Sequence, residues 1–409
     1  MNFINSDWIV TCDDNFTIIQ DGAIVFDEKI IEIDTKENIE KKYPNYNFSY
    51  QGEGSVIMPG LVNSHVHLEF SANKTTLKYG NFVKWLFSII SHRDELIEKA
   101  TKELISSELK KMVEVGTTTI GAVSSYGLDL DACVESKLNI VYFTEVLGSK
   151  ADMIDTLFSD FKQKLYLAKK KKSDRFFPAI AIHSPYSTHP FLVREVIKIA
   201  KEESLSVTAH FMESVAENDW LNYSQGEFET FFKEMLDQHI ALQKPNEFLA
   251  AFKGVKNLTF THCVEANEKE LAQIKELGAS IIHCPNSNRL LNNTILNLSH
   301  LNGIPMSLGT DGLSSNYTLD MFLEMRNAFF IHTNSEQLEL AKKLILSATS
   351  NGAKCLGLQS KGSLEVGNDS DLITFQIPNL EDENDLPTAI ILHKTKINTT
   401  YIKGKNELF

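Results

Sequence analysis

The sequence Val56-Ile57-Met58-Pro59-Gly60-Leu61-Val62-Asn63-Ser64-His65-Val66-His67 is an apolar run that ends in two histidines one residue apart. Side chains of a strand alternate in direction, so His65 and His67 point the same way and can hold one metal ion between them. Two partly buried histidines with ordinary hydrogen bonds are an equal alternative for this stretch taken alone. The rest of the chain has to decide between the two.

The bulk composition is that of a globular protein with a large core. The chain has 409 residues, of which 43% are hydrophobic and 23% charged, and its formal net charge is −14. One α/β barrel of about 250 residues plus a smaller domain fits this length. The negative charge argues against nucleic acid as a partner, because phosphate binding rests on clustered Lys and Arg. The one basic run, 169–172, is interpreted as a solvated helix end.

Cysteine usage and the N-terminus point to the cytoplasm. The five cysteines are far apart and lack a Cys-X-X-Cys spacing, which argues against a disulfide framework and against a thiolate zinc site. The first residues show no basic segment followed by a long apolar core, and no run of about 18 apolar residues occurs. We therefore expect a cytoplasmic protein with no membrane partner. The sequence leaves open whether it forms a homodimer.

Both ends of the chain are rich in strand patterns. The N-terminal part predicts strands at 8–11, 16–19, 23–26 and 30–33, and the C-terminal part predicts strands at 363–367, 371–375, 389–392 and 400–405. Two β-rich ends around a different middle predict a small β-sandwich domain built from both termini, residues 1–54 and 362–409.

The middle of the chain, 55–361, alternates short apolar runs with helical stretches, the pattern of parallel strands joined by crossover helices. Eight candidate strands lie near 56–62, 117–123, 139–144, 179–183, 206–210, 258–262, 280–283 and 305–309. Eight such units predict an α/β fold of the (β/α)8 TIM-barrel type.

Reactive side chains of such a barrel gather at the carboxyl ends of its strands. Histidines 183, 210, 262 and 283 stand at or just beyond predicted strand ends, as do His65 and His67. If His210 completes a metal site, Glu213 lies close enough to exchange a proton with a bound substrate, although capping the next helix is an equal alternative.

The last three strand ends supply the other candidates. A neutral His262 can accept a proton from a metal-bound water. Asp311, flanked by glycines, can complete a site of three histidines and one carboxylate, with a turn-forming Asp-Gly as the alternative. Asn288 and Arg289, after the seventh strand, either contact substrate or shape a turn.

These motifs resemble the amidohydrolase superfamily of metal-dependent barrel hydrolases. The matching segments are 59–67, 210–213, 261–263 and 310–312, and they are similar to the mononuclear aminohydrolase branch, which acts on adenosine, S-adenosylhomocysteine, guanine and chlorotriazines. The resemblance implies metal ligands at His65, His67, His210 and Asp311, proton carriers at Glu213 and His262 with help from Asp311, and a substrate contact at His183.

The same resemblance implies one metal ion. Dinuclear members carry a bridging carboxylated lysine at the end of the fourth strand, where this sequence has His183. Imidazole and carboxylate donors favour Zn²⁺, and Fe²⁺ is the alternative because ligand type does not separate the two.

Shorter segments narrow the expected substrate. Residues 25–30, 69–74, 287–291 and 310–316 resemble the aminodeoxyfutalosine deaminases of bacteria that make menaquinone by the futalosine route. The hypothesis is hydrolytic deamination of a 6-aminopurine nucleoside, with Glu95 at the place of a ribose-binding carboxylate. Arg289 is expected either to meet a substrate carboxylate or to form a structural salt bridge. The alternatives are another aminohydrolase of the branch and an inactive barrel that serves as a scaffold.

Overall fold

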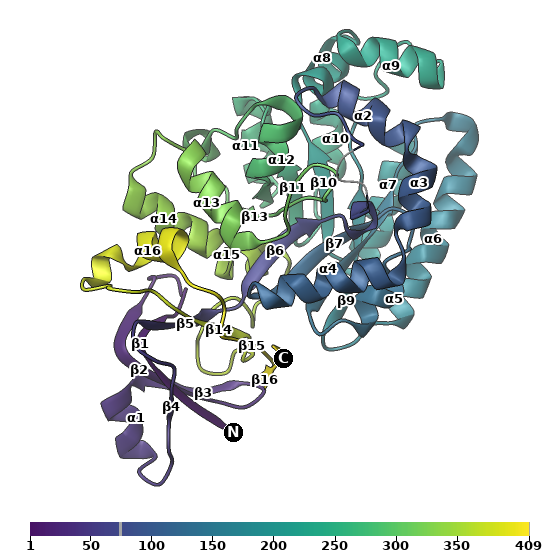
Figure 1. The fold of residues 1–409 in the computed structure, drawn as a ribbon. Coiled ribbons are helices and arrows are strands. Elements are labelled where there is room, and N and C mark those ends of the chain that lie inside the picture. Colours follow the sequence, from purple (N-terminus) through teal and green to yellow (C-terminus); the bar gives the residue numbers. More distant parts are fainter. Residues whose placement is uncertain (73–75, 409) are drawn as a thin grey trace.

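The computed structural model describes residues 1–72 and 76–408, which form a barrel and a smaller sheet (Figure 1). Asn73 and Lys74, the end of the segment 69–74, lie outside the described residues. The parts of the chain that the structure describes contain no helix long and apolar enough to cross a membrane.

Eight parallel strands make the barrel. They follow one another in chain order: β6 (Leu61–Val66), β7 (Thr117–Ser124), β8 (Asn139–Val146), β9 (Phe176–Ile182), β10 (Val207–Phe211), β11 (Leu258–His262), β12 (Ser280–His283) and β13 (Met306–Leu308). The Asp311 amide, just beyond β13, donates to the His65 carbonyl at 3.0 Å and so joins the last strand to the first. The predicted (β/α)8 fold is confirmed.

Helices surround this barrel (Figure 1). They are α2 (Phe82–Ser91), α3 (Arg93–Lys99), α4 (Lys102–Glu114), α5 (Leu130–Glu135), α6 (Ile154–Lys170), α7 (Pro190–Glu203), α8 (Val215–Tyr223), α9 (Glu227–Leu236), α10 (Pro245–Ala251), α11 (Glu268–Glu276), α12 (Pro285–Asn292), α13 (Met321–Ile331), α14 (Gln337–Ser347) and α15 (Ser350–Cys355), with short 3-10 turns at Leu68–Phe70, Ala151–Met153 and Leu298–Leu301.

Helix α7 illustrates how sequence sets these elements. Pro190 occupies the first turn, where its missing N–H costs nothing, and the His189 ring accepts a hydrogen bond from the Phe191 amide. The helix ends at Ser204 in a left-handed conformation with φ 53°. Its apolar residues Leu192, Val193, Val196 and Ile197 recur at helical spacing and pack in the same core as strand β9.

Both termini build the second sheet, beside the barrel (Figure 1). Its strands are β1 (Asn2–Val10), β2 (Ile18–Phe26), β3 (Ile30–Thr35), β4 (Ser49–Tyr50), β5 (Ser55–Pro59), β14 (Leu372–Gln376), β15 (Thr399–Ile402) and β16 (Lys405–Asn406), accompanied by α1 (Lys36–Lys42), α16 (Leu386–His393) and a 3-10 turn at Glu383–Asp385. The order is β16-β15-β14-β5-β1-β2-β3, with β4 on β1. The expected small β domain from both ends is confirmed, as one mixed sheet.

The apolar run 56–62 is two strands rather than the one predicted. It divides at Gly60, whose amide donates to Asp371 of the terminal sheet, while the Leu61 amide donates to Gly116 of the barrel. A Cβ on Gly60 would lie 2.1 Å from the Thr118 side chain, so a glycine is required where the chain passes between the sheets. The division into 1–54 with 362–409 and 55–361 stays a prediction, and β5 pairs within the terminal sheet.

Three terminal strand predictions were also wrong. The predicted strands 16–19 and 23–26 are one strand, β2, which begins at Ile18, and 363–367 forms no strand. The run 389–392 lies in helix α16, which has Pro387 in its first turn and packs its apolar residues in a core shared with α13 and α14. A short apolar run fits a buried helix as well as a strand, and periodicity alone does not separate the two.

Candidate active site

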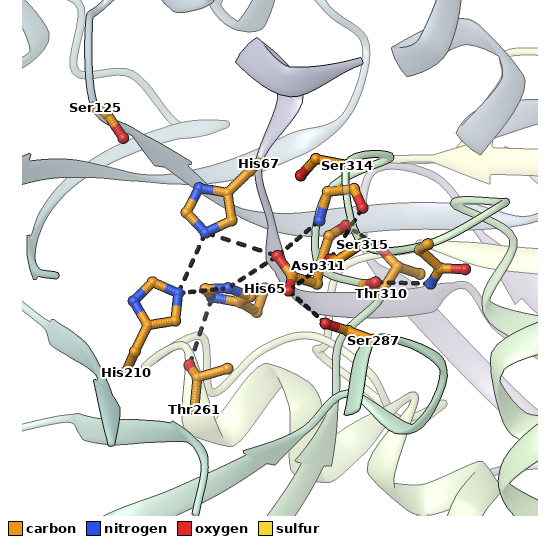
Figure 2. Close-up of polar contacts among 12 residues, drawn as sticks. His65, His67, Ser125, His210, Thr261, Ser287, Thr310, Asp311, Ser314 and Ser315 are labelled. Atoms are coloured by element: carbon orange, nitrogen blue, oxygen red, sulfur yellow. Dashed lines mark hydrogen bonds and ion pairs between the residues drawn. The ribbon is translucent and has the colours of Figure 1, made fainter. Parts of the chain in front are cut away.

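The four predicted metal ligands converge at the carboxyl ends of the barrel strands (Figure 2). The Nε2 atom of His210 lies 3.2 Å from Nε2 of His65 and 3.3 Å from Nε2 of His67. Oδ1 of Asp311 lies 3.7 Å from Nε2 of His65 and 3.8 Å from Nε2 of His67. All four side chains are buried, and their ligand atoms face one point.

The spacing of these atoms fits a divalent metal centre. Four ligands about 2.1 Å from a tetrahedral ion lie about 3.4 Å from one another, close to the observed separations. Three imidazole nitrogens this close cannot all carry protons, and a carboxylate beside them supplies negative charge. By these four separations His65, His67, His210 and Asp311 form a donor set suited to a divalent cation, which we call the four-donor cluster.

Hydrogen bonds from neighbouring strand ends orient the cluster. The Ser287 and Ser315 hydroxyls each donate to Oδ2 of Asp311 at 2.8 Å, and the Gly312 amide donates to its Oδ1 at 2.7 Å. Nδ1 of His210 donates to the His183 carbonyl at 2.7 Å, which leaves the Nε2 atom of His210 bare. Such outer contacts hold ligands in place for a metal.

Burial sets the protonation states of the cluster. It lowers the pKa of His67 to about 3, and the nearby His210 ring adds to that effect. Burial also lowers the pKa of His65 and of His210. Burial alone would raise the pKa of Asp311, but the surrounding imidazoles outweigh it and lower that pKa. Neutral rings and an ionised carboxylate are the forms that bind a metal.

Glu213 and His262 form a second pair against the cluster. Their Oε1 and Nε2 atoms lie 3.4 Å apart, and both side chains are buried. Burial, with the charges of Asp311 and Glu217, raises the pKa of Glu213 well above its usual value, whereas burial lowers the pKa of His262 to about 4. The pair therefore combines a carboxyl that holds its proton to higher pH than usual with an imidazole that is neutral at neutral pH, a combination that can give and accept a proton.

The backbone at the end of β11 is strained in a way that aims this imidazole. His262 has φ 74° and Cys263 has φ 52°, values that non-glycine residues rarely adopt. The Cys263 amide donates to the Phe211 carbonyl of β10, which fixes the turn. Strain of this kind gathers at functional sites.

One cavity of about 490 Å³ opens onto the cluster and the acid-base pair. His183 lies in its wall and its Nδ1 contacts the Ser187 hydroxyl at 2.6 Å. Most of the lining is apolar, from α2, α9 and the segment after β8; it includes Trp85, Leu86, Ile89, Phe231 and Met235. A pocket of this size and lining suits a flat, largely apolar ligand with a few polar groups.

The structure also places Glu145, which the sequence reasoning missed, in this cavity wall. It follows the predicted third strand directly, and β8 extends to include it. Its Oε2 accepts a hydrogen bond from the Ser125 hydroxyl, its Oε1 has no partner among the described residues, and burial raises its pKa. The strand-end rule applied to the histidines would have found it.

Three predicted substrate contacts lie elsewhere. Glu95 is on the exposed face of α3, where its carboxylate binds Lys99 at 2.5 Å, and Arg289 is exposed on α12. Neither lines the cavity. Asn288 is fully buried behind His262 and contacts that ring instead.

A model of the amidohydrolase family matches residues 56–406. The chain belongs to the amidohydrolase family. The resemblance read from the strand-end motifs is thus confirmed, and the match runs from β5 of the terminal sheet through the whole barrel to β16.

Individual amidohydrolases resemble the chain over its whole length. The aminodeoxyfutalosine deaminase of Nitratiruptor sp. is 46% identical over 393 residues, 96% of each chain, and an adenosine deaminase of Helicobacter pylori is 34% identical over 98% of each. The crystal structure of Helicobacter pylori aminofutalosine deaminase with methylthio-coformycin superposes with a TM-score of 0.94 at 31% identity, covering 100% of both chains.

Proposed function

We propose that this amidohydrolase is a metal-dependent hydrolytic deaminase of a 6-aminopurine nucleoside, with aminodeoxyfutalosine as its substrate. The observation that carries the reaction type is the buried Glu213–His262 pair, 3.4 Å apart, which lines the same cavity as the four-donor cluster. The relative that is 46% identical along 96% of the chain is named for this substrate, which supports the choice among aminopurines.

The four-donor cluster would hold one divalent cation, for which imidazole and carboxylate donors favour Zn²⁺ over the alternative Fe²⁺. A metal bound there supplies a Lewis acid that makes water a nucleophile near neutral pH. The cluster's outer hydrogen bonds, such as that from Ser287 to Asp311, would hold the ligands at this spacing.

Glu213 and His262 together can carry out every proton transfer that the reaction needs. As water adds to C6 of the purine, His262 accepts its proton at Nε2 and the Glu213 carboxyl gives a proton to ring N1. In the second half, the Glu213 carboxylate takes the proton of the new C6 hydroxyl, and the His262 imidazolium protonates the amino group. The C6–N bond breaks, ammonia leaves, and both side chains return to their starting forms.

His183 would contact the reacting ring from the cavity wall, beside the cluster. The apolar lining beyond it would cover the part of the substrate that lies away from the purine. Ribose binding by Glu95 and carboxylate binding by Arg289 find no support in the placement of those side chains.

Ammonia release tests the function. The purified, metal-loaded protein is assayed with aminodeoxyfutalosine, adenosine, 5′-methylthioadenosine, S-adenosylhomocysteine, guanine and a chlorotriazine, and its metal is quantified. We expect the highest kcat/KM for aminodeoxyfutalosine. Adenosine is the second candidate because a relative 34% identical over 98% of the chain carries that name.

Two outcomes contradict the proposal. Turnover of guanine or the triazine, with none of the 6-aminopurine nucleosides, would assign the chain to another aminohydrolase activity. Absence of bound metal together with no turnover after addition of Zn²⁺ or Fe²⁺ would leave an inactive scaffold.

A further inference from the structure

A line of hydrogen bonds leads from the acid-base pair away from the cavity. Nδ1 of His262 lies 2.8 Å from Oδ1 of Asn288. The amide nitrogen of Asn288 lies 3.5 Å from Nδ1 of His283, and Nε2 of His283 lies 3.0 Å from Nε2 of His332. The first three side chains are fully buried and His332, which ends α13, is 7% exposed.

The first contact fixes the tautomer of His262. An amide oxygen only accepts, so Nδ1 of His262 must carry the proton and, in a neutral ring, Nε2 is bare. This Nε2 has no hydrogen-bond partner among the described residues and lies 3.4 Å from Oε1 of Glu213. The atom that has to accept a proton from water is thus the one left free.

The other contacts determine which way the amide of Asn288 points. Its NH2 group donates to Nδ1 of His283, so the proton of that ring sits on Nε2 and is donated to Nε2 of His332. A rotated amide would reverse each donor and acceptor in turn and would place the proton of His262 on Nε2. Each link has one donor, so the line can only change direction as a unit.

Neutral rings are needed for such a line, because an imidazolium has two donors and would break it. Burial lowers the pKa of His262 and of His332 to about 4 and the pKa of His283 well below its usual value.

We propose that Asn288 is a positioning residue that fixes the His262 tautomer, and that its orientation is set by the His283–His332 pair outside the cavity. The proposal rests on the proposed function only through the role of His262 as proton acceptor. His332 does not line the cavity, so its substitution removes no direct contact with the substrate.

Selective ¹⁵N labelling of the 12 histidines reads the tautomers of the zinc-loaded protein directly, without substrate. We expect His262 to carry its proton on Nδ1 and His283 on Nε2. In Asn288→Asp the carboxylate still accepts from Nδ1 of His262 but cannot donate to His283. His262 should therefore keep its tautomer while His283 moves its proton to Nδ1.

Asn288→Leu removes both contacts at similar volume. We expect a signal from protonated Nε2 of His262 and a fall in kcat of at least about 10-fold, part of the about 10²–10⁴-fold that acid-base catalysis contributes, with KM changed less than about 3-fold. A role in substrate binding would instead raise KM and leave the tautomer unchanged.

His332→Gln and His332→Leu form a matched pair. The glutamine oxygen can accept from Nε2 of His283, so this variant should match the parent in spectrum and kcat. The leucine should shift the His262 signal and lower kcat by a few fold. His300, an exposed residue paired with Asn297, gives the control His300→Leu, with no change expected.

Melting curves and metal content are measured for every variant. The proposal is overturned if wild-type His262 carries its proton on Nε2, or if His332→Leu leaves its tautomer as in the parent. Should a leucine variant not fold, the Asn288→Asp spectrum alone decides. Predicted tautomers without turnover of any aminopurine nucleoside would refute the proposed function and leave this inference standing.

Discussion

Glu213 is the residue on which the proposed chemistry depends most. It is buried, its pKa is raised well above the usual value by that burial, and it lies 3.4 Å from His262, yet it takes no part in the four-donor cluster. Its separation from the cluster makes acid catalysis and metal binding experimentally distinct at this position.

Glu213→Gln should keep the metal and lose about 10²–10⁴-fold in kcat, because the amide retains the shape but cannot transfer the proton. Steady-state kinetics and metal analysis measure the two effects. Glu265→Gln, a half-buried carboxyl outside the cavity, is the matched control and should keep full activity. Near-normal turnover of the first variant would remove the general-acid role.

At the scale of elements, β6 and the end of β13 meet at a tight seam beside the cluster. A Cβ on Gly309 would lie 2.8 Å from Cβ of His65 and 3.0 Å from its backbone nitrogen and oxygen. The first and last barrel strands therefore meet through a bare backbone where two cluster ligands, His65 and Asp311, are held.

Gly309→Ala should force these strands apart, lower the free energy of unfolding by about 1–3 kcal/mol and weaken metal binding. Denaturant titration and competition with a chelator measure the two changes. Met306→Leu, a volume-conserving change in the same strand, should alter neither by much. Unchanged metal affinity in the glycine variant would mean that the seam tolerates the extra carbon.

The sequence placed candidate site residues well where they stand at strand ends, and poorly where a loop determines the position of the side chain. His65, His210 and Asp311 could be placed together because parallel strands of a barrel end at one rim. Glu95 could not be placed, because its distance from that rim depends on how α3 leaves α2. Glu145 was missed because the predicted strand stopped one residue before it, although β8 extends to Val146. Helix α16 was missed because a short apolar run fits a buried helix as well as a strand.

At the scale of the whole molecule, a buried ion cluster joins the terminal sheet to the barrel. Nζ of Lys361 lies 2.7 Å from Oδ2 of Asp369 and 2.8 Å from Oδ2 of Asp371, and the amide of Asn139, at the start of β8, donates to the same Asp371 oxygen at 2.8 Å. The Lys361 side chain is only 2% exposed. Its charge therefore balances the buried carboxylate of Asp371 and, together with Lys29, that of Asp369.

Lys361→Met should lower the free energy of unfolding by about 3–5 kcal/mol, because it leaves the buried carboxylate of Asp371 without a charged partner. Urea denaturation measures the change. Lys41→Met, which breaks an exposed pair with Glu37, should cost at most about 1 kcal/mol. Equal effects of the two would show that the buried cluster adds nothing beyond a surface pair.

The same cluster predicts a pH dependence. Burial alone would raise the pKa of Asp369, but hydrogen bonds from Lys29 and Lys361 outweigh it and hold that pKa below 3.8. Because the folded pKa is the lower one, the stability this carboxylate contributes is complete above pH 3.8 and is lost as the pH falls through the folded value.

Asp369→Asn should therefore show a shallower loss of stability than the parent below about pH 4. Urea denaturation at several pH values between neutrality and pH 3 provides the comparison. Parallel curves for parent and variant would mean that other carboxyls account for the acid sensitivity.

The seam has a consequence for how the protein is made. His65 and His67 leave the ribosome early, whereas Asp311 follows only after the other seven barrel strands have been synthesised. A metal ion that meets the nascent chain finds an incomplete donor set, and full affinity arises only when the last strand docks against the first. We therefore expect the metal ion to bind late, after the barrel has closed. A bound ion would then stabilise the closed barrel rather than nucleate its folding.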